Sequence, residues 1–327
     1  MNSKARISAV GSYVPEKRLT NSDLERLVET NDEWIVQRTG MRERRIAAPG
    51  EYTSHMCISA IDNMIAEYGV SLEDVDLILT ATNTPDLPFP TVSCLVQAHF
   101  GIPSTGALDL NATCAGFVYA LHTANAFITA GLHRKILVLG ADHMSAITDY
   151  TDRTTCILLG DGAGAALVEA AADGAPGAFL GHYLGSDGTG GVHLYRTGLA
   201  DRLGEKDLEG AGKLVQNGRE VYKFAVGTVP KGVSALLDSA GMAMSEVDWF
   251  IPHSANLRII ESVCERMDFP VEKTLYSLEY YGNTSAATIP LSLHMGLKEG
   301  KIKPGDLLLL YGFGGGLVHG GLLVRWG

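Results

Sequence analysis

Strand-like segments recur in this chain at a fixed spacing, and that repeat restricts the possible folds more than any other feature. Residues 71–79 (SLEDVDLIL) and 244–251 (MSEVDWFI) each place an acidic edge and a Val-Asp pair before an apolar run. Val75 and Val247 are 172 positions apart. An apolar run of this length, bounded by polar residues, is typical of a strand buried in a sheet.

A second pair of segments repeats at nearly the same offset. Residues 135–140 (KILVLG) and 306–312 (DLLLLYG) are about 171 positions apart, and a glycine-rich return strand follows each, at 160–168 and 314–324. Two strand pairs at one offset support an internal duplication better than either match alone. Because buried strands resemble one another, a chance match of apolar runs is the alternative.

The segments between these strands predict helices. Four end at or near a glycine and one near a proline, and they cover residues 53–68, 115–130, 220–239, 256–267 and 284–298. Apolar strands that alternate with helices indicate an α/β fold whose strands are buried on both faces. The duplication then predicts two similar halves, roughly 1–172 and 173–327, that pack together. A loop-rich stretch at 172–212 is expected to connect them.

Composition and charge limit the function. The chain has 327 residues, of which 46% are hydrophobic and 19% charged, as in globular proteins with a large core. A net charge of -11 argues against general nucleic-acid binding. We find no signal peptide and no apolar run near the roughly 18 residues of a membrane span, so we expect a cytoplasmic protein without a membrane partner. The five scattered cysteines predict neither disulfides nor a metal site.

Cys114 is the first candidate for chemistry. It follows a short apolar run and precedes the helix expected at 115–130, which places it at a helix N-terminus. The unpaired backbone N–H groups and the helix dipole there favour a thiolate over a thiol. A thiolate is a good nucleophile. The alternative is that Cys114 is only a small buried hydrophobic residue.

The duplication brings two further residues towards Cys114. A shift of Cys114 by 172 positions reaches Ala286, three positions from Asn283, so two helix starts are expected to face each other around one pocket. His253 follows the strand-like segment 244–251 and precedes a helix, which is where sites assemble in α/β folds. A lone histidine is more often structural, and Asn283 also suits a helix N-cap.

Motifs along almost the whole chain occur in the order of one enzyme family: GSYVPEKRLTNSDLE, TNDEWIVQRTGMRERRIAAPGE, CAGF, TDYTDRTT, GDGAGAAL, PHSANLRII, YGNTSAATIPL and YGFGGG. They resemble β-ketoacyl-acyl-carrier-protein synthase III, a branch of the thiolase superfamily. The resemblance implies the five-layered αβαβα thiolase fold and a homodimer. It also implies condensation of a short acyl-CoA primer with malonyl-acyl-carrier protein, at the start of type II fatty acid synthesis, with no cofactor or metal.

The resemblance also implies roles for individual residues. Cys114, His253 and Asn283 match the catalytic triad of the family. Cys114 takes the acyl group from CoA, and His253 and Asn283 donate hydrogen bonds to the malonyl thioester oxygen as it gains negative charge. The backbone N–H groups of Cys114 and Gly315 match the oxyanion hole, where glycine also permits close backbone approach.

The binding residues of the family for CoA have counterparts as well. Trp34 and Arg153 resemble the pair that sandwiches the adenine, a use suited to an indole and a planar guanidinium. Arg38 matches a phosphate contact. The segments that line the pantetheine tunnel contain Gly218, Ala255 and Asn256.

Two further sets concern protein partners. Phe89 resembles the residue that crosses the dimer interface to floor the partner's acyl pocket. Arg258, with Lys223 and Arg219 nearby, could form a basic patch for the acidic acyl carrier protein, although a solvated charged face explains these three residues almost equally well.

The chain departs from the common family pattern at two positions. The family often has His-Gln-Ala-Asn where this chain has His-Ser-Ala-Asn, with Ser254 in place of the glutamine. It often has Ala-Ala-Cys where this chain has Ala-Thr-Cys, with Thr113 in place of the second alanine. Both lie near the tunnel and could alter its shape. The Ser254 form and TDYTDRTT resemble synthases of Gram-positive bacteria, some of which accept branched primers. The choice between acetyl-CoA and isobutyryl- or isovaleryl-CoA therefore stays open.

Three alternatives to the main interpretation remain at this point. One is a related condensing enzyme of secondary metabolism with a different acceptor. Another is a nucleotide-binding oxidoreductase, suggested by the glycine run at 160–164, although this run lacks the G-x-G-x-x-G spacing and precedes a strand. The last is a non-catalytic protein with the thiolase fold, against which the intact triad argues.

Overall fold

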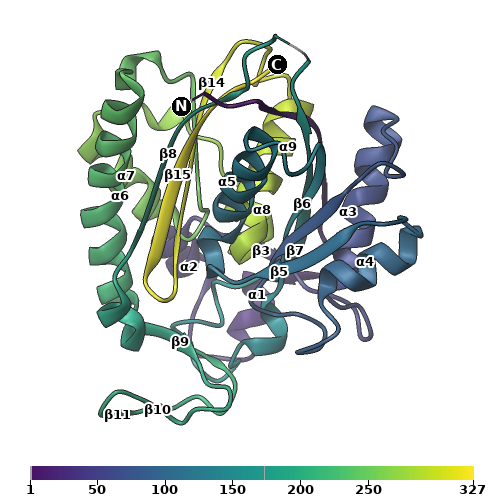
Figure 1. Cartoon of the computed structure of the whole chain (residues 1–327). Helices are drawn as coiled ribbons and strands as arrows, with labels where there is room; N and C mark the ends of the chain where they lie inside the picture. The colour runs from purple at the N-terminus through teal and green to yellow at the C-terminus, as the bar shows by residue number, and fades with distance from the viewer. Residues whose placement is uncertain (1, 173) are drawn as a thin grey trace.

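The computed structural model describes residues 2–172 and 174–327, which form five layers of helices and sheets (Figure 1). Two sheets alternate with three helical layers, and each sheet is covered on both faces. The outer helices are α3 (Thr53–Tyr68) and α4 (Val92–Phe100) on one side, and α6 (Gly218–Ala240) and α7 (Leu257–Met267) on the other. The middle layer holds α5 (Gly116–Thr129) and α9 (Thr288–Lys298). The predicted αβαβα fold is confirmed.

Four strands of the first sheet have counterparts, in the same order, in the second sheet. The first runs β1 (Ala5–Tyr13), β7 (Asp161–Ala170), β6 (Lys135–His143), β4 (Leu77–Ala81), β5 (Gly106–Leu110). The second runs β8 (Phe179–Ser186), β15 (Val318–Arg325), β14 (Leu307–Gly314), β13 (Trp249–Pro252). In both sheets the first three strands are antiparallel neighbours, and the next pairing is parallel.

The duplication extends to the register of the strands. Leu77 of β4 pairs with Ile136 of β6, and Trp249 of β13 pairs with Leu308 of β14. Both residues of the first pair lie 172 positions before those of the second. The spacing read from the sequence is therefore a spacing between structurally equivalent positions.

Two equivalent glycines let the middle helices approach their sheets. A Cβ on Gly140 would lie 2.6 Å from the carbonyl oxygen of Ala286, and a Cβ on Gly312 would lie 2.6 Å from Cα of Ala115. No side chain fits at either distance. Gly140 and Gly312 are 172 positions apart, so each half needs glycine at the same place for the same reason.

All five predicted helices are present, and the outer helix α3 has the predicted bounds. The two middle helices begin later than predicted because a short 3-10 turn precedes each one. These turns are η1 (Thr113–Ala115) before α5 and η6 (Ser285–Ala287) before α9. Both contain residues that matter for the site below.

The expectation of a loop-rich connection at 172–212 is partly wrong, because this stretch contains strand β8. Its glycines resemble a loop in the sequence, but packing requires them. A Cβ on Gly185 would lie 2.5 Å from Nε2 of His319, and one on Gly181 would lie 3.1 Å from Cβ of Ala240. The rest of the stretch holds the turn η3 (Gly188–His193), β9 (Leu194–Arg196) and a projecting hairpin of β10 (Arg202–Leu203) and β11 (Lys206–Asp207) (Figure 1).

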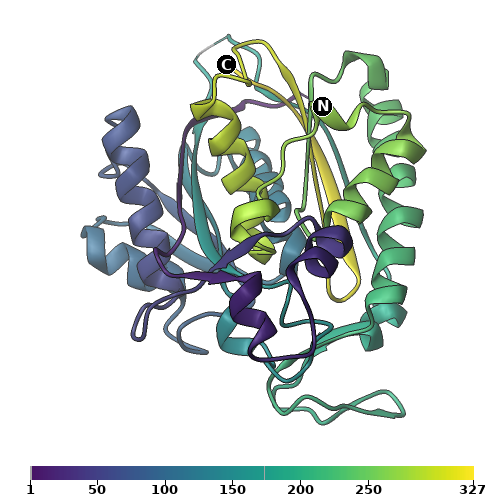
Figure 2. The same ribbon diagram turned by 180° about the vertical axis from the view of Figure 1, so that it is seen from behind.

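Shorter elements complete the chain. On the face seen in Figure 2, the N-terminal segment forms β2 (Arg18–Thr20), α1 (Asn21–Glu25), α2 (Asp32–Thr39) and β3 (Glu43–Arg45), of which α2 packs against α7 and β3 against α8 (Leu278–Tyr281). The others are η2 (Met144–Ile147), β12 (Leu214–Gln216), η4 (Met244–Glu246) and η5 (Val271–Lys273). Within the part of the chain that the structure describes, none of the helices has the length and apolar character needed to cross a membrane.

Candidate active site

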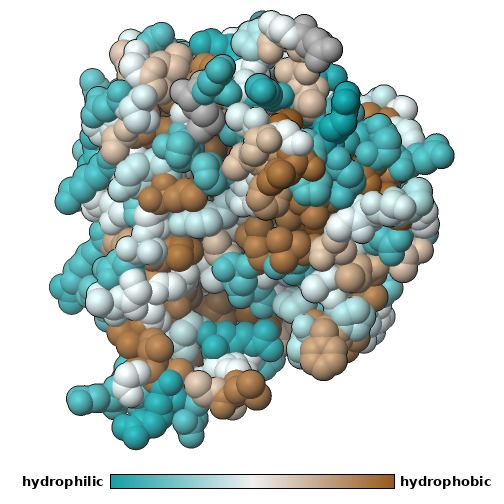
Figure 3. All heavy atoms as spheres, viewed as in Figure 1, coloured by the Kyte–Doolittle hydropathy of each residue, from teal (hydrophilic) through white to brown (hydrophobic). Residues whose placement is uncertain are grey.

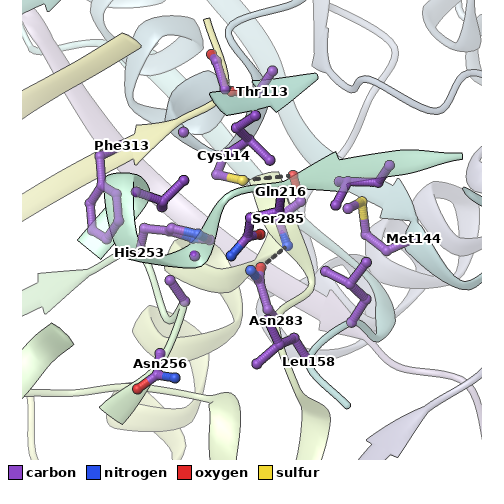
Figure 4. A pocket seen from close by; sticks show the side chains of 18 of the residues that line it. Thr113, Cys114, Met144, Leu158, Gln216, His253, Asn256, Asn283, Ser285 and Phe313 are labelled. Carbon is purple, nitrogen blue, oxygen red and sulfur yellow. Dashed lines mark hydrogen bonds between the residues drawn. The ribbon is translucent and has the colours of Figure 1, made fainter. Parts of the chain in front are cut away.

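One cavity of about 1230 Å³ reaches Cys114, His253 and Asn283. Cys114 comes from the turn η1 before α5, His253 directly follows β13, and Asn283 lies just before the turn η6. Figure 4 shows the three side chains around the same space, with Phe313 beside His253. The expected meeting of two helix starts in one pocket is therefore present in the fold.

A strained turn presents Cys114 to this cavity. Thr113 has a φ of 45°, in the left-handed region that β-branched residues rarely adopt. Its backbone N–H donates to Oδ1 of Asn111 at 3.1 Å, and its hydroxyl donates to the carbonyl oxygen of Gly315 at 3.1 Å. These two hydrogen bonds hold the backbone of Thr113 in a conformation that is unfavourable for a threonine by itself.

The other half contains the same turn. Ser285 has a φ of 53°, and its backbone N–H donates to Oδ1 of Asn283 at 2.9 Å. Asn283 and Ser285 lie 172 positions after Asn111 and Thr113. Because Oδ1 of Asn283 accepts this bond, the amide nitrogen Nδ2 is the group left to face the cavity.

The cysteine thiol is less acidic than its helix position predicts. Burial raises the pKa of the Cys114 thiol to about 12, and a hydrogen bond of 3.3 Å from the Ser285 hydroxyl opposes this rise. The sequence led us to expect a favoured thiolate. That expectation is wrong for the resting protein, because loss of hydration outweighs the donors at the helix start.

His253 is buried and neutral. Its Nδ1 shares a hydrogen bond of 2.8 Å with Oγ1 of Thr288, and its backbone N–H donates to the carbonyl of Tyr311 at 2.8 Å. The ring meets Phe313 edge-on at 5.1 Å. Burial lowers the pKa of His253 to about 3. Since Nδ1 is engaged, Nε2 is the ring nitrogen available to a ligand in the cavity.

The glycine loop after β14 lies against the cysteine. A Cβ on Gly314 would lie 2.8 Å from the backbone nitrogen of Cys114, and a Cβ on Gly315 would lie 3.1 Å from the carbonyl oxygen of Leu194. Glycine at these positions leaves the space beside Cys114 free of side chains. Gly315 is fixed there through its carbonyl by the Thr113 hydroxyl.

The equivalent space in the other half is filled. Asp142 lies at the end of β6, 172 positions before Gly314, and its carboxylate accepts a hydrogen bond of 3.1 Å from the backbone N–H of Ala286. Ala286 lies 172 positions after Cys114. One helix start therefore binds the carboxyl group of Asp142, whose pKa is raised by burial, and the other faces the cavity.

The two residues expected to sandwich the adenine, Trp34 and Arg153, contact each other. The guanidinium carbon of Arg153 lies 5.3 Å from the centroid of the Trp34 ring, and that of Arg38 lies 5.9 Å from it. Arg153 also donates to the carbonyl of Glu29 at 3.2 Å. A ring stacked between two planes needs about 7 Å, twice the usual contact distance. Arg153 must therefore swing away before a base can enter.

The other tunnel residues line the same cavity. Gly218 opens α6, and Ala255 follows His253. Asn256 caps α7: its Oδ1 accepts from the backbone N–H of Arg258 at 2.9 Å, and its Nδ2 donates to the carbonyl of Arg38 at 3.1 Å. The Asn256 side chain thus joins the two walls of the cavity.

The expected basic patch is only partly assembled. Arg258 is exposed and lines the cavity, whereas Arg219 is exposed on α6 without lining it. Nζ of Lys223 lies 2.7 Å from Oε1 of Glu220, so Lys223 is already paired with a carboxylate of its own helix. Phe89 is 83% exposed and does not line the cavity of its own chain.

Reasoning from the sequence missed the polar groups behind the triad. Asn83 and Ser285 line the cavity, and Asp142 and Thr288 are buried directly behind them. The signal for Ser285 was available, because the duplication pairs it with Thr113, the neighbour of Cys114. Nothing in the sequence distinguishes Asp142 from other aspartates that follow a strand.

The glycine run at 160–164 belongs to sheet packing. It forms the start of β7, and a Cβ on Gly164 would lie 2.4 Å from Cβ of Pro290 in α9. The run therefore allows a helix to approach a strand and does not open a helix, as a dinucleotide-binding loop would. This packing role removes the observation that suggested an oxidoreductase.

A cysteine, a histidine and an asparagine at the junction of two duplicated αβ halves define a thiolase-fold condensing enzyme. Two family models match the chain: 3-oxoacyl-[acyl-carrier-protein] synthase III over residues 108–188, and the C-terminal part of the same family over residues 237–326. The chain belongs to the β-ketoacyl-[acyl-carrier-protein] synthase III family, and it is an acyltransferase.

Individual relatives agree over the full length. The chain is 60% identical over 324 residues to β-ketoacyl-[acyl-carrier-protein] synthase III 2 of Halalkalibacterium halodurans, covering 99% of this chain and 97% of the relative. It is 57% identical over 325 residues to the enzyme of that name from Bacillus subtilis, covering 99% of both. The crystal structure of a synthase III from Thermus thermophilus superposes with a TM-score of 0.94 at 43% identity, covering 98% of this chain and 99% of that one.

Proposed function

We propose that this protein condenses a short acyl-CoA with malonyl-acyl-carrier protein, through an acyl group held on Cys114, to start fatty acid synthesis. The observation that carries the proposal is the meeting of Cys114, His253 and Asn283 in one cavity that also reaches Trp34 and Arg153. Membership of the synthase III family supports the two substrates.

The first half-reaction transfers the acyl group. The Cys114 sulfur attacks the thioester carbon of the acyl-CoA, a new carbon–sulfur bond forms, and the bond to the CoA sulfur breaks. The proton that leaves Cys114 is the one that the CoA thiol gains. Because burial raises the pKa of Cys114, the thiolate forms only with the help of nearby donors.

The second half-reaction forms the carbon–carbon bond. Malonyl-acyl-carrier protein loses carbon dioxide. The electron pair of the broken carbon–carbon bond moves towards the thioester oxygen, which gives an enolate. Nε2 of His253 and Nδ2 of Asn283 donate hydrogen bonds to that oxygen. This role requires the proton of neutral His253 to sit on Nε2, so the single proton of the Thr288 hydroxyl has to go to Nδ1 and not to the carbonyl oxygen of Ser285, which lies 3.0 Å from it. The enolate carbon then attacks the acyl group and releases the Cys114 thiolate.

The tetrahedral intermediates of both steps need a site for their oxyanion. We assign it to the backbone N–H groups of Cys114 and Gly315. The bond from the Ala286 N–H to Oδ2 of Asp142 supports this assignment, because it shows a carboxyl oxygen bound by the backbone at the equivalent helix start. Gly314 keeps a side chain out of the corresponding space beside Cys114.

The mouth of the cavity suits CoA and a carrier protein. Trp34 and Arg153 hold the adenine once Arg153 has moved, and Arg38 contacts a phosphate. The pantetheine arm runs past Gly218, Ala255 and Asn256 towards Cys114. Arg258, which is exposed at the mouth, is the best placed of the three basic residues to meet an acidic carrier protein; Arg219 and Lys223 extend that patch along α6.

A homodimer is the expected assembly. Strand β5 is an edge strand that, among the described residues, pairs only with β4. Leu87, Phe89 and Leu108 are 50%, 83% and 47% exposed near this edge. Hydrophobic residues gather at the centre of the same face, over α5 and β5 (Figure 3). Pairing of two β5 strands would cover both features and send Phe89 to the acyl pocket of the partner.

The duplication suggests where the chain divides. We place the boundary between residues 172 and 173, which makes 1–172 the half with Cys114 and 173–327 the half with His253 and Asn283. Every strand of the first sheet lies before this boundary, and every strand of the second sheet lies after it.

The experiment that tests the function is intact-protein mass spectrometry after incubation with acetyl-, isobutyryl- and isovaleryl-CoA. Wild type should gain one acyl group, and Cys114→Ala should gain none. Cys94→Ala is the matched control, because Cys94 is the exposed cysteine and should not matter. The acyl-CoA that loads fastest identifies the primer. Absence of any adduct on wild type would refute the proposal and favour a condensing enzyme with another acceptor.

A further inference from the structure

We propose that Ser285 is a catalytic residue whose hydroxyl stabilises the Cys114 thiolate, and that Asn83 and Asp142 are positioning residues that aim this hydroxyl at the sulfur. The inference rests on the proposed function, in which Cys114 is the nucleophile. It adds a group to the reaction that the triad and the oxyanion hole do not include.

The Ser285 hydroxyl makes direct contact with the reacting atom. Its Oγ lies 3.3 Å from Sγ of Cys114, in the orientation of a hydrogen-bond donor (Figure 4). A hydroxyl has one proton to donate, and the sulfur of a thiolate accepts it better than the sulfur of a thiol. The bond therefore strengthens when Cys114 loses its proton for attack, and again when the acyl group leaves it.

Asn83 determines which way this hydroxyl points. Its Nδ2 donates to Oγ of Ser285 at 3.1 Å, so the oxygen is engaged as an acceptor and its own proton is turned towards the sulfur. The same Nδ2 donates to Oδ2 of Asp142 at 2.9 Å. Both protons of the Asn83 amide are thus used, and the side chain has a single favourable orientation.

Asp142 holds the relay in place. Its side chain is fully buried and accepts five hydrogen bonds. The donors are the Thr82 and Thr84 hydroxyls, the backbone N–H and Nδ2 of Asn83, and the backbone N–H of Ala286. Burial raises the pKa of Asp142, and these bonds oppose that rise because they stabilise the carboxylate. The Ser285 hydroxyl also lies near Asp142, and its hydrogen bond of 3.3 Å goes to the Cys114 sulfur.

The backbone also presents Ser285 to the sulfur. The residue has a φ of 53°, and the bond from its N–H to Oδ1 of Asn283 keeps it in this strained conformation. Ala286, the next residue, is tied to Asp142. The turn is thus held on both sides of Ser285, by Asn283 of the triad and by the buried carboxylate.

The duplication shows that the hydroxyl has acquired a separate use in each half. Thr113 occupies the equivalent position in the first half, with the same left-handed backbone. Its hydroxyl donates to the carbonyl of Gly315 and so positions the glycine loop. Each hydroxyl reaches across to the other half, but only that of Ser285 reaches the nucleophile.

Charge near the sulfur makes such a donor necessary. The titratable groups that face Cys114 are His253, which is neutral because burial lowers its pKa, and Asp142, whose negative charge raises the pKa of the thiol. Neither group stabilises a thiolate. Asn83 and Ser285 lie between the carboxylate and the sulfur, and the bond from Ser285 lowers the pKa of Cys114.

The test is the pH dependence of Cys114 alkylation by iodoacetamide, followed by intact mass in a Cys94→Ala background. Below the pKa of the thiol, the alkylation rate is proportional to the thiolate fraction. We expect Ser285→Ala to lower this rate about 10-fold across the measurable range, the factor expected from loss of a hydrogen bond to a charged group. Ser285→Thr, which keeps the hydroxyl, should restore most of it.

A variant that leaves Ser285 in place guards against a folding defect. Asn83→Ala should lower alkylation in the same direction, because the hydroxyl loses its orientation, whereas the KM for acyl-CoA should change little. An alkylation rate equal to wild type in both Ser285→Ala and Asn83→Ala would overturn the inference. Acyl transfer from acyl-CoA to Cys114 is measured on the same samples, so failure of wild type to acylate would instead reject the proposed function.

Discussion

The carboxylate of Asp142 accepts a hydrogen bond of 3.1 Å from the backbone N–H of Ala286, at the position that corresponds to Cys114 in the duplicated fold. The residue that corresponds to Asp142 is Gly314, which has no side chain to fill the same space. The two halves thus use one backbone geometry in opposite ways. In one half the helix start binds the buried carboxyl group of Asp142, and in the other half it faces the substrate cavity.

This comparison predicts that adding one methyl group at Gly314 impairs catalysis. In Gly314→Ala the new Cβ would lie 2.8 Å from the backbone nitrogen of Cys114, so it would displace the turn and crowd the oxyanion. We expect kcat to fall roughly 100-fold or more, as after loss of an oxyanion donor, with a smaller change in KM. Steady-state kinetics measure both.

A matched control separates crowding from a general effect of alanine. Gly198 also lines the cavity, and a Cβ placed there meets no atom within 4 Å. Gly198→Ala should therefore keep the activity of wild type. If Gly314→Ala were equally active, the space beside the Cys114 N–H would not hold an oxyanion.

The triad variants should divide the reaction into its two halves. Cys114→Ala is expected to lose acyl transfer but to retain decarboxylation of malonyl-acyl-carrier protein, because decarboxylation needs only the hydrogen bonds from His253 and Asn283. His253→Ala and Asn283→Ala should impair decarboxylation more than acyl transfer, by roughly 100-fold for loss of one donor. Release of labelled carbon dioxide and formation of the acyl-enzyme report the two steps separately. Acyl transfer by Cys114→Ala would disprove the nucleophile assignment.

Much of this architecture could be predicted because it depends on patterns within short segments. Continuous apolar runs identified the buried strands, and the offset between Val75 and Val247 related the two halves. His253 was found because it follows a strand and precedes a helix. Asn283 was found because the duplication placed it opposite Cys114.

What the sequence did not predict depends on packing between distant segments. Strand β8 resembled a loop because Gly181 and Gly185 are required by neighbours far along the chain. The high pKa of Cys114 follows from burial by elements of both halves, which the helix position alone does not indicate. The relay through Asp142 likewise joins residues that no local pattern connects.

His253 should make the stability of the protein depend on pH. Burial lowers its pKa from 6.5 to about 3, so between these values the unfolded chain binds a proton that the folded chain does not. The stability that neutral His253 contributes is full above pH 6.5 and is lost as the pH falls towards 3. From pH 7 to pH 5 the loss amounts to about 2 kcal/mol in the free energy of unfolding.

The prediction is checked by urea unfolding of wild type and His253→Gln at both pH values. Other groups titrate in the two proteins alike, so the difference between them isolates the histidine. Wild type should lose about 2 kcal/mol more than the variant between pH 7 and pH 5. Equal losses would mean that His253 is protonated, or exposed to water, in the folded protein.

The stacked pair at the cavity mouth should act on the nucleotide alone. Trp34→Ala or Arg153→Ala removes one face of the adenine site, so we expect the KM for acetyl-CoA to rise about 10-fold while kcat stays near wild type. Acetyl-pantetheine, which lacks the adenine, is the matched control substrate. Its kinetics should be unchanged in both variants. An equal rise for both substrates would place Trp34 and Arg153 on the pantetheine tunnel instead.

The edge of the first sheet should control assembly. Phe89→Asp puts a charge on a side chain that is 83% exposed beside the unpaired edge of β5, and burial of that charge in a dimer is unfavourable. We expect wild type to sediment as a dimer and this variant to sediment as a monomer at the same concentration. Leu199→Asp is the control, because Leu199 is fully exposed but lies next to the projecting hairpin. If Leu199→Asp dissociated the dimer and Phe89→Asp did not, the hairpin would be the interface.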